Sequence, residues 1–518
     1  MNSREIVRRL QGYVGGRPQR RGENLSLWLA EDQEILVVVF VRIGGEARPW
    51  GIAYGTPSAP PTILSVTEGR DRDTVAEMMA TFAPVILNHV QHPRTTGRRP
   101  LGHEDLSPLR QLWLPGGTHL SMLHHLAYAY TFTRFGGDNQ ENLHALGRAC
   151  GWLFREANRP GEQHVVVASA ALRSTFSFPS EDMRQGHLGY LLAWLSSTDG
   201  YEAGLAKASD AERESVATTL NPHVERNEIE PALEAWKKAQ TAGSERSSSA
   251  AAARIESILE RELGRRFELT VETIARLRSD GRRLNAGMTD LVDEALKQQW
   301  GSYLNTELRL QDGLPTYIPA VETDRNPAAA AAGYQAHMAA AENLSSLLIH
   351  DDEELLAEAI ADGNAFHGTI VDVNDAGEGR KRVPIWTVRE SSGNALRLRT
   401  GSRVCVVGLP RRTAQVKEIH GDEDGSRRIE LEILNLKLAV KGAVGRDSWP
   451  PVDSLWVGQE LDFVDAPAAD ISIRKSFRSW KKDVPGAWLT HARPGGQKAQ
   501  PAAEVDLDDQ NAVLVETK

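Results

Sequence analysis

The spacing of the apolar residues changes at about residue 363, and this change limits what the chain can fold into. From about residue 107 to residue 362, apolar residues recur mainly every three or four positions, which is typical of helices that bury one face. From Gly363 onward the spacing becomes two, over short runs separated by Gly- and Asp-rich turns. The chain must therefore divide its apolar residues between helices and a strand-rich unit.

The residues before about position 105 combine strand-like runs with one helical segment. Residues 35–41, ILVVVFV, form a continuous apolar run, and two shorter strand-like runs follow before residue 70. Residues 71–90 then have helical spacing. The simplest arrangement for this order is an antiparallel sheet covered by a helix.

These patterns predict an α+β multidomain protein. We expect an α+β sheet unit with an antiparallel sheet (1–105), a helical bundle packed on it (106–241), a polar low-complexity linker (242–253), a helical region (254–362), a small β-barrel of OB or SH3-like size (363–465), and a basic and aromatic strap that leads into a disordered tail (466–518).

Charge and cysteine content exclude several classes of protein. The 518 residues carry a formal net charge of −10, so any binding of nucleic acid must come from a local basic patch. Only Cys150 and Cys405 are present, far apart in sequence, which argues against a disulfide framework and excludes a cysteine-rich zinc site. The first residues lack the apolar core of a secretory signal, and no apolar run is long enough to span a bilayer, so we expect a cytoplasmic protein without membrane contact.

Common catalytic signatures are absent from the sequence. There is no phosphate-binding G-x-x-x-x-G-K-[ST] loop, no G-x-S-x-G elbow, no H-E-x-x-H helix and no dinucleotide-binding glycine pattern. The expectation is a protein that is not an enzyme and needs no cofactor. The alternative is an enzyme of unassigned class in the N-terminal region, with these candidate groups: His119, His124, Arg148, Arg155 and His187.

Histidines cluster once, at positions 119, 124 and 125. Metal ligands on one helix face need a spacing of three or four residues, whereas His119 and His124 are five apart. Because no carboxylate stands at ligand spacing in this segment, we expect no metal site there. Packing and capping are the expected roles of these side chains.

The strongest candidate for a binding surface is the stretch LRLRTGSRVCVVGLPRRTAQVKEI, residues 396–419. If its first part is a strand, Arg397 and Arg399 lie on one face and two leucines on the other. Arg403 continues the basic side, with Trp386 and Phe366 nearby in sequence as stacking platforms. The alternative is an ordinary solvated sheet, because acidic residues in the same region nearly cancel the cations.

A second basic and aromatic segment follows residue 465. Its cations exceed its acids by three over a short span and alternate with aromatic side chains, which is typical of nucleic-acid contact. The alternative is a strap whose aromatic residues dock onto the barrel. Together the two segments give these candidate nucleic-acid-binding residues: Arg397, Arg399, Arg403, Arg411, Arg412, Arg474, Lys475, Arg478, Lys481, Lys482 and Trp480.

These observations favour one functional hypothesis and leave two alternatives open. The favoured one is a non-catalytic adaptor that touches DNA or RNA and works with a protein partner such as an ATPase, helicase or nuclease. Bacterial genome maintenance or phage (antiviral) defence would be a natural setting. The alternatives are the enzyme described above and a protein-binding scaffold that presents the helices bearing Trp152 and Trp194.

Overall fold

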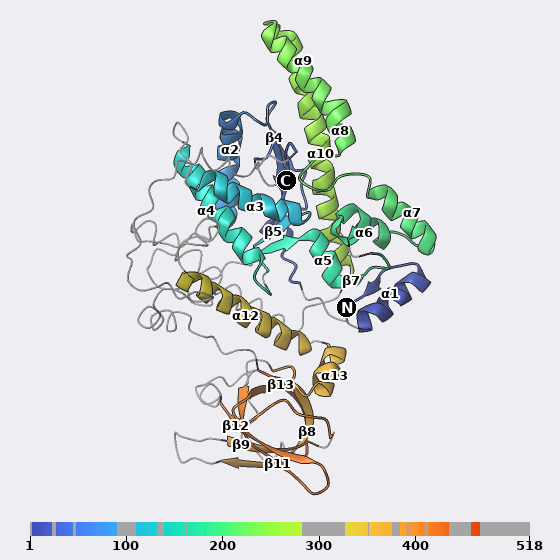
Figure 1. Cartoon of the computed structure of the whole chain (residues 1–518), viewed down its shortest axis with the longest axis vertical. Helices are drawn as coiled ribbons and strands as arrows, with labels where there is room; N and C mark the ends of the chain where they lie inside the picture. Colours follow the sequence, from blue (N-terminus) through green and yellow to red (C-terminus); the bar gives the residue numbers. More distant parts are fainter. Residues whose placement is uncertain are drawn as a thin grey trace, which may run out of the picture.

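The computed structural model describes residues 3–22, 27–44, 48–90, 110–131, 139–161, 163–181, 183–281, 327–350, 352–375, 384–390, 393–409, 413–434 and 457–466. Two parts stand out in Figure 1. An N-terminal body contains the described residues up to 281, with a long helical hairpin projecting from it. A C-terminal unit contains two helices and a small ring of strands.

A five-stranded mixed sheet lies at the centre of the N-terminal body, in the order β4-β3-β2-β5-β6. Its strands are β2 (Ile35–Val41), β3 (Gly51–Gly55), β4 (Thr62–Ser65), β5 (Gln111–Leu114) and β6 (Val165–Val167). The first three strands pair antiparallel, with Val39 opposite Ala53. Strand β5 runs parallel to β2, and β6 runs parallel to β5.

Helices cover both faces of this sheet. Helix α10 (Glu245–Ser279) packs on β2, β3 and β4, and Leu263 lies so close to Gly51 that a side chain there would clash. On the other face, Phe82 of α2 (Arg72–Val90) contacts Phe40. Helices α3 (Gly117–Tyr130) and α4 (Gln140–Ala157) complete that layer. All seven residues of β2 are therefore buried, which explains its uninterrupted apolar run.

Shorter elements surround this core. They are α1 (Ser3–Gly15), β1 (Gln19–Arg20), α5 (Ala168–Thr175), β7 (Phe176–Ser177), α6 (Leu188–Leu195), α7 (Tyr201–Ala211), α8 (Pro222–Val224) and α9 (Glu230–Thr241). The 3-10 turns are Asp32–Glu34 and Arg184–Gly186, and a π-helical turn spans Glu225–Ile229. Trp152 and Trp194 belong to the core, so they offer no exposed patch to a scaffold partner.

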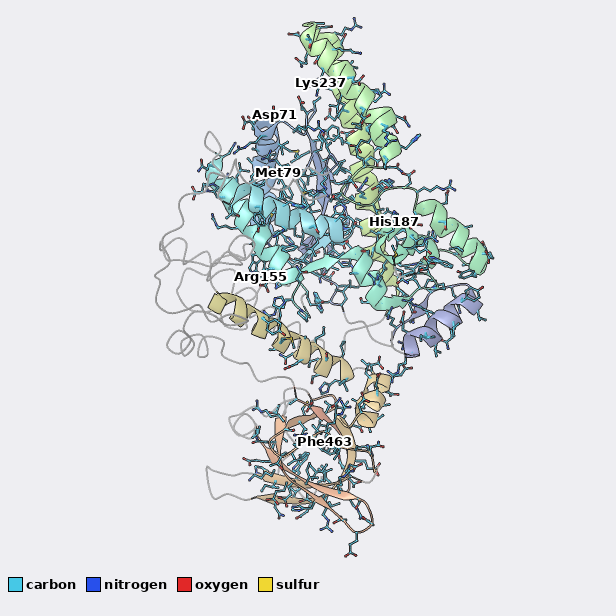
Figure 2. All side chains as sticks on the ribbon, in the orientation of Figure 1. Asp71, Met79, Arg155, His187, Lys237 and Phe463 are labelled. Atoms are coloured by element: carbon cyan, nitrogen blue, oxygen red, sulfur yellow. The ribbon has the colours of Figure 1, made fainter. Side chains whose placement is uncertain are left out.

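The C-terminal unit is built on six antiparallel strands that close into a barrel, in the order β10-β11-β12-β9-β8-β13. The strands are β8 (Ala365–Asp375), β9 (Pro384–Glu390), β10 (Arg403–Val406), β11 (Thr413–Gly421), β12 (Arg427–Ile433) and β13 (Glu460–Asp465). Phe366 and Phe463 stack in its interior with ring centroids 4.8 Å apart, and Phe463 is labelled in Figure 2. The predicted change of period at residue 363 thus marks the start of the strand-rich unit.

Two helices cover one side of the barrel. Helices α12 (Pro327–Ile349) and α13 (Glu353–Ala361) pack against β13 and β8 respectively. At this junction Cys405 is buried with Ala359 and Val464, and the His350 Nε2 atom lies 3.6 Å from the cysteine sulfur. Both cysteines are buried, and no disulfide joins them.

Two features of the predicted fold are corrected by the structure. The N-terminal sheet is mixed rather than antiparallel, because β5 and β6 join it from the segment expected to be a helical bundle. The expected linker over residues 242–253 is largely helical, since α10 begins at Glu245 and packs against α9. Alanine is the strongest helix former, so the Ala-rich run extends a helix. The domain boundaries themselves stay predictions.

Candidate nucleic-acid interface

Cations on the barrel surface divide into paired and unpaired groups. Ion pairs join Arg389 to Asp424 (2.5 Å), Lys417 to Glu432 (2.9 Å), Arg427 to Glu390 (3.3 Å) and Arg428 to Asp422 (2.9 Å). Among the barrel residues that the structure describes, Arg397, Arg399 and Arg403 are the arginines and lysines whose side chains have no hydrogen bond or ion pair. All three are exposed. We call them the arginine row.

The segment that carries Arg397 and Arg399 is extended but is not a strand, which corrects the sequence-based expectation. Its side chains alternate between the core and solvent, as predicted. Leu398 is buried in the barrel core, and the arginines on either side of it are exposed. The backbone is held at one end by the hydrogen bond from the Arg397 amide to the Gly363 carbonyl, 2.9 Å. Leu398 therefore anchors the segment and directs both guanidinium groups to solvent.

Arg403 stands on the far side of a tight turn. Gly401 adopts a φ of +91°, a conformation that favours glycine, and the Ser402 amide donates to the Arg399 carbonyl at 2.8 Å. Arg403 then begins β10 opposite Gln415. Because its ends are six positions apart in sequence, the row spans at most about 20 Å, the length of a few nucleotides.

The structure does not describe the other predicted binding residues. Arg411 and Arg412 lie outside the described residues, as do the strap residues Arg474, Lys475, Arg478, Trp480, Lys481 and Lys482. The expected stacking platforms are wrong, because Trp386 and Phe366 are buried in the barrel core. Within the described part of the barrel, no Phe, Tyr or Trp side chain is exposed. Sequence alternation alone did not show that these rings face inward.

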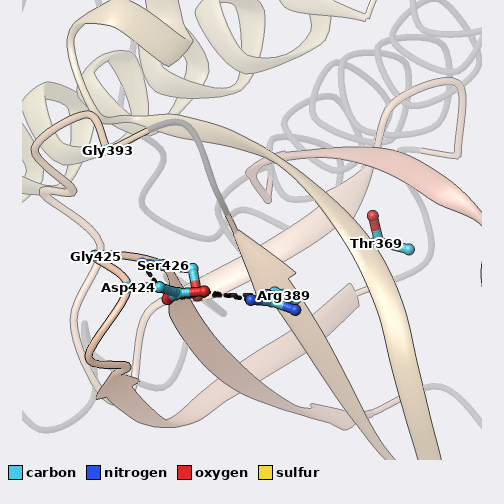
Figure 3. A pocket seen from close by; sticks show the side chains of 6 residues that line it. All are labelled: Thr369, Arg389, Gly393, Asp424, Gly425 and Ser426. Carbon is cyan, nitrogen blue, oxygen red and sulfur yellow. Dashed lines mark hydrogen bonds and ion pairs between the residues drawn. The ribbon is translucent and has the colours of Figure 1, made fainter.

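A polar pocket opens where β8, β9 and the turn between β11 and β12 meet, and it was not anticipated from sequence. It has a volume of about 500 Å³ and is lined by Thr369, Arg389, Gly393, Asp424, Gly425 and Ser426 (Figure 3). Asp424 accepts from the Arg389 guanidinium and from the Ser426 hydroxyl at 2.6 Å. The hydroxyl and amide of Ser426 lower the pKa of Asp424 to about 2, so this carboxylate stays ionised and holds Arg389. The Asp-rich turn was predicted as a turn, but its partner Arg389 is far away in sequence.

His119, the first candidate of the enzyme hypothesis, is fully buried. Its Nδ1 atom accepts from the Phe40 amide at 3.1 Å, so Nε2 carries the proton and donates to the Val216 carbonyl at 3.0 Å. Burial lowers the pKa of His119 to about 3. This neutral imidazole ties β2 and α3 to the segment around residue 216, which is a structural role.

The other N-terminal candidates have separate positions. His124 packs against Phe154 with ring centroids 4.7 Å apart, between α3 and α4. His187 caps α6 by accepting from the Tyr190 amide, and Arg155 binds the neighbouring Glu156. Arg148 lies half-buried on α4. Figure 2 labels His187 well away from Arg155, so these two groups do not share a site.

The carboxyl ends of the parallel strands β2 and β5 are where an α/β sheet usually binds its ligand. Here residues 215–220 fill that position. The Arg42 amide donates to the Thr218 carbonyl, and Arg266 donates to the carbonyls of Ala217 and Thr219. Arg266 is itself fully buried and paired with Glu262 at 2.9 Å. Neither strand contributes a carboxylate, histidine or cysteine at this edge.

The described residues contain no group of three or more His, Cys, Asp or Glu side chains that could hold a metal ion. None of their helices combines the length and apolar content needed to cross a bilayer. Compared with known proteins, the chain matches no family model, no curated protein and no solved structure.

Proposed function

We propose that the chain is a non-catalytic, nucleic-acid-associated adaptor whose C-terminal barrel, of OB or SH3-like size, contacts DNA or RNA. The observation that carries this proposal is the contrast between the arginine row and the other described cations of the barrel. An arginine held by a carboxylate must give up that pair to bind a phosphate, whereas Arg397, Arg399 and Arg403 need not. Binding a phosphate therefore costs less free energy at these three arginines than at the paired cations of this surface.

The contacts that such a row makes determine the kind of binding. Phosphate contacts position a strand but carry no base information. The described barrel exposes no Phe, Tyr or Trp, and its exposed rings, His367 and His420, lie beside carboxylates, so it supplies no large stacking platform of its own. We therefore expect binding that is strongly salt-dependent and largely indifferent to base sequence. Any stacking falls to the strap around Trp480, whose contribution stays a prediction.

The N-terminal body supports the non-catalytic part of the proposal. The usual ligand position of its sheet is filled by residues 215–220, and the candidate histidines have packing and capping roles. A protein that binds nucleic acid without acting on it needs a partner for any chemistry. An ATPase, helicase or nuclease is the class of partner we propose, in genome maintenance or phage defence.

Fluorescence anisotropy of labelled single- and double-stranded DNA and RNA tests this function. Titrations at about 50 and 200 mM salt compare the wild-type chain with a variant in which Arg397, Arg399 and Arg403 are changed to Ala. Removing three phosphate contacts lowers the slope of log K against log salt by about 2 for single strands. Between 50 and 200 mM salt, the affinity of the wild type should therefore fall by a factor about 20 times larger than the factor for the variant.

The control variant removes the same charge elsewhere. Lys238, Arg246 and Arg254 are exposed on the α9–α10 hairpin, at the opposite end of the molecule from the barrel (Figure 1). Their change to Ala should leave the salt slope unchanged. Equal losses in both variants would show that net charge, not the row, governs binding, and no binding by the wild type at 50 mM salt would remove the proposed function.

A further inference from the structure

Helix α1 docks on the N-terminal body by its polar face. Glu5 is 9% exposed and accepts hydrogen bonds from the Ser177 hydroxyl at 3.0 Å and from Arg21 at 2.8 Å. Two turns along the helix, Gly12 is buried against Pro179. A carboxylate network and a glycine thus form the face that an ordinary amphipathic helix would build from apolar side chains.

The apolar side chains of α1 face outward instead. They are Ile6 (42% exposed), Val7 (52%), Leu10 (59%), Val14 (85%) and Tyr13 (54%), whose ring also packs at one edge of the set on Tyr201 of α7, with ring centroids 4.3 Å apart. Successive residues are 100° apart around a helix, which puts the centre of this set about 150° from the docked residues Glu5 and Gly12. The result is a continuous apolar stripe along two turns, which we call the α1 stripe. Scattered exposed apolar residues need no explanation, but a contiguous stripe on one helix does.

The charges of α1 are occupied on its flanks. Arg8 pairs with Glu354 of α13 at 3.0 Å, and Arg4 lies 3.6 Å from the same carboxylate. Arg9 pairs with Glu5 at 3.0 Å. The outward face is therefore apolar and electrically neutral. A lipid surface favours an apolar stripe flanked by free cations that reach anionic headgroups, and these arginines already bind carboxylates.

We propose that the α1 stripe is a self-association surface that binds the α1 stripe of a second copy of the chain. An uncharged apolar face is complementary to itself, and a twofold axis across it sets the two helices antiparallel with their dipoles opposed. The stripe exposes on the order of 400 Å² per copy, so the pair buries about 800 Å² in total, somewhat less than the roughly 1,000 Å² of a stable specific interface. The dimer is accordingly weak and depends on concentration.

Dimerisation adds a property to the proposed function and does not depend on it. Two copies joined at α1 carry two arginine rows, and a strand that reaches both is held by avidity without any new contact. The dimer itself is measured without nucleic acid, so its failure and that of the proposed function are distinguishable.

Sedimentation equilibrium of the full chain, from about 1 to 200 µM, tests the dimer. The wild type should move from monomer towards dimer across this range. The double variant Leu10→Asp with Val14→Asp should remain monomeric, because it places charge at the centre of the stripe. Val457→Asp, which changes an apolar residue of similar exposure (45%) in the C-terminal unit, should dimerise like the wild type.

Three outcomes overturn the inference. They are a monomeric wild type at every concentration, a dimer that the double variant leaves intact, and a dimer that Val457→Asp disrupts equally. Circular dichroism of each variant establishes that it is folded. Co-sedimentation with anionic phosphatidylserine vesicles, lost only in the double variant, would assign the stripe to a membrane instead.

Discussion

His119 should make the N-terminal body sensitive to mild acid. Its folded-state pKa of about 3 lies below the ordinary value of 6.5, because burial disfavours the charged ring and Arg266 adds to this effect. The unfolded chain therefore binds one more proton than the folded chain between these two values. Stability falls as the pH drops through 6.5, and the loss levels off below pH 3.

The size of the effect follows from the two pKa values. At pH 5 the unfolded imidazole is almost fully protonated, whereas the folded one is almost fully neutral. The body should lose about 2 kcal/mol of unfolding free energy between pH 7.5 and pH 5 through this group. Protonation also removes the acceptor for the Phe40 amide, since Nδ1 then carries a hydrogen.

Amide hydrogen exchange of β2 measures this loss locally, after correction for the intrinsic pH dependence of exchange. The variant His119→Leu cannot titrate, so its β2 exchange should depend less on pH, by about 2 kcal/mol, than that of the wild type. At pH 7.5 it should be less stable by about 2–4 kcal/mol, because the Phe40 amide and Val216 carbonyl lose their partner. An unchanged pH dependence in the variant would refute the assigned role.

Two further changes test other parts of the structure. Asp424→Asn should free Arg389 from its ion pair and so add a fourth unpaired arginine to the barrel surface, which should steepen the salt slope of single-strand binding by about 0.7. An unchanged or shallower slope in anisotropy titrations would count against phosphate contact at this surface. Arg266→Met should destabilise the body by about 3–5 kcal/mol in urea unfolding, because the buried Glu262 loses its closest cation and two carbonyls lose their donor, whereas a cost below about 1 kcal/mol would mean that water replaces the guanidinium.

Local patterns in the sequence predicted much of the fold. The period of two after residue 363 predicted the barrel, and the apolar run of residues 35–41 predicted β2. Strands β5 and β6 were not predicted. They have four and three residues respectively, which is too short for the spacing of apolar residues to show a period. Helix α1 has a strong apolar period, but its sequence does not reveal that it docks by the opposite face.

The arginine row could be predicted only in part. Alternation around Leu398 correctly indicated that Arg397 and Arg399 point to solvent. Which cations are paired depends on strand pairing, since Arg389 and Asp424 are 35 residues apart in sequence. The same alternation suggested stacking by Trp386, but a strand has two faces and the pattern does not tell which face a single aromatic residue takes.

The most direct test of the central claim is arginine footprinting of the wild-type chain. An arginine-selective dicarbonyl reagent is applied with and without saturating single-stranded DNA or RNA at about 50 mM salt, where phosphate contacts are strongest, and modification is located by mass spectrometry. Arg397, Arg399 and Arg403 should react readily in the free protein and be protected in the complex, while Arg246 and Arg254 of the projecting hairpin react equally in both. Bound nucleic acid that leaves the row fully reactive would contradict the proposed interface.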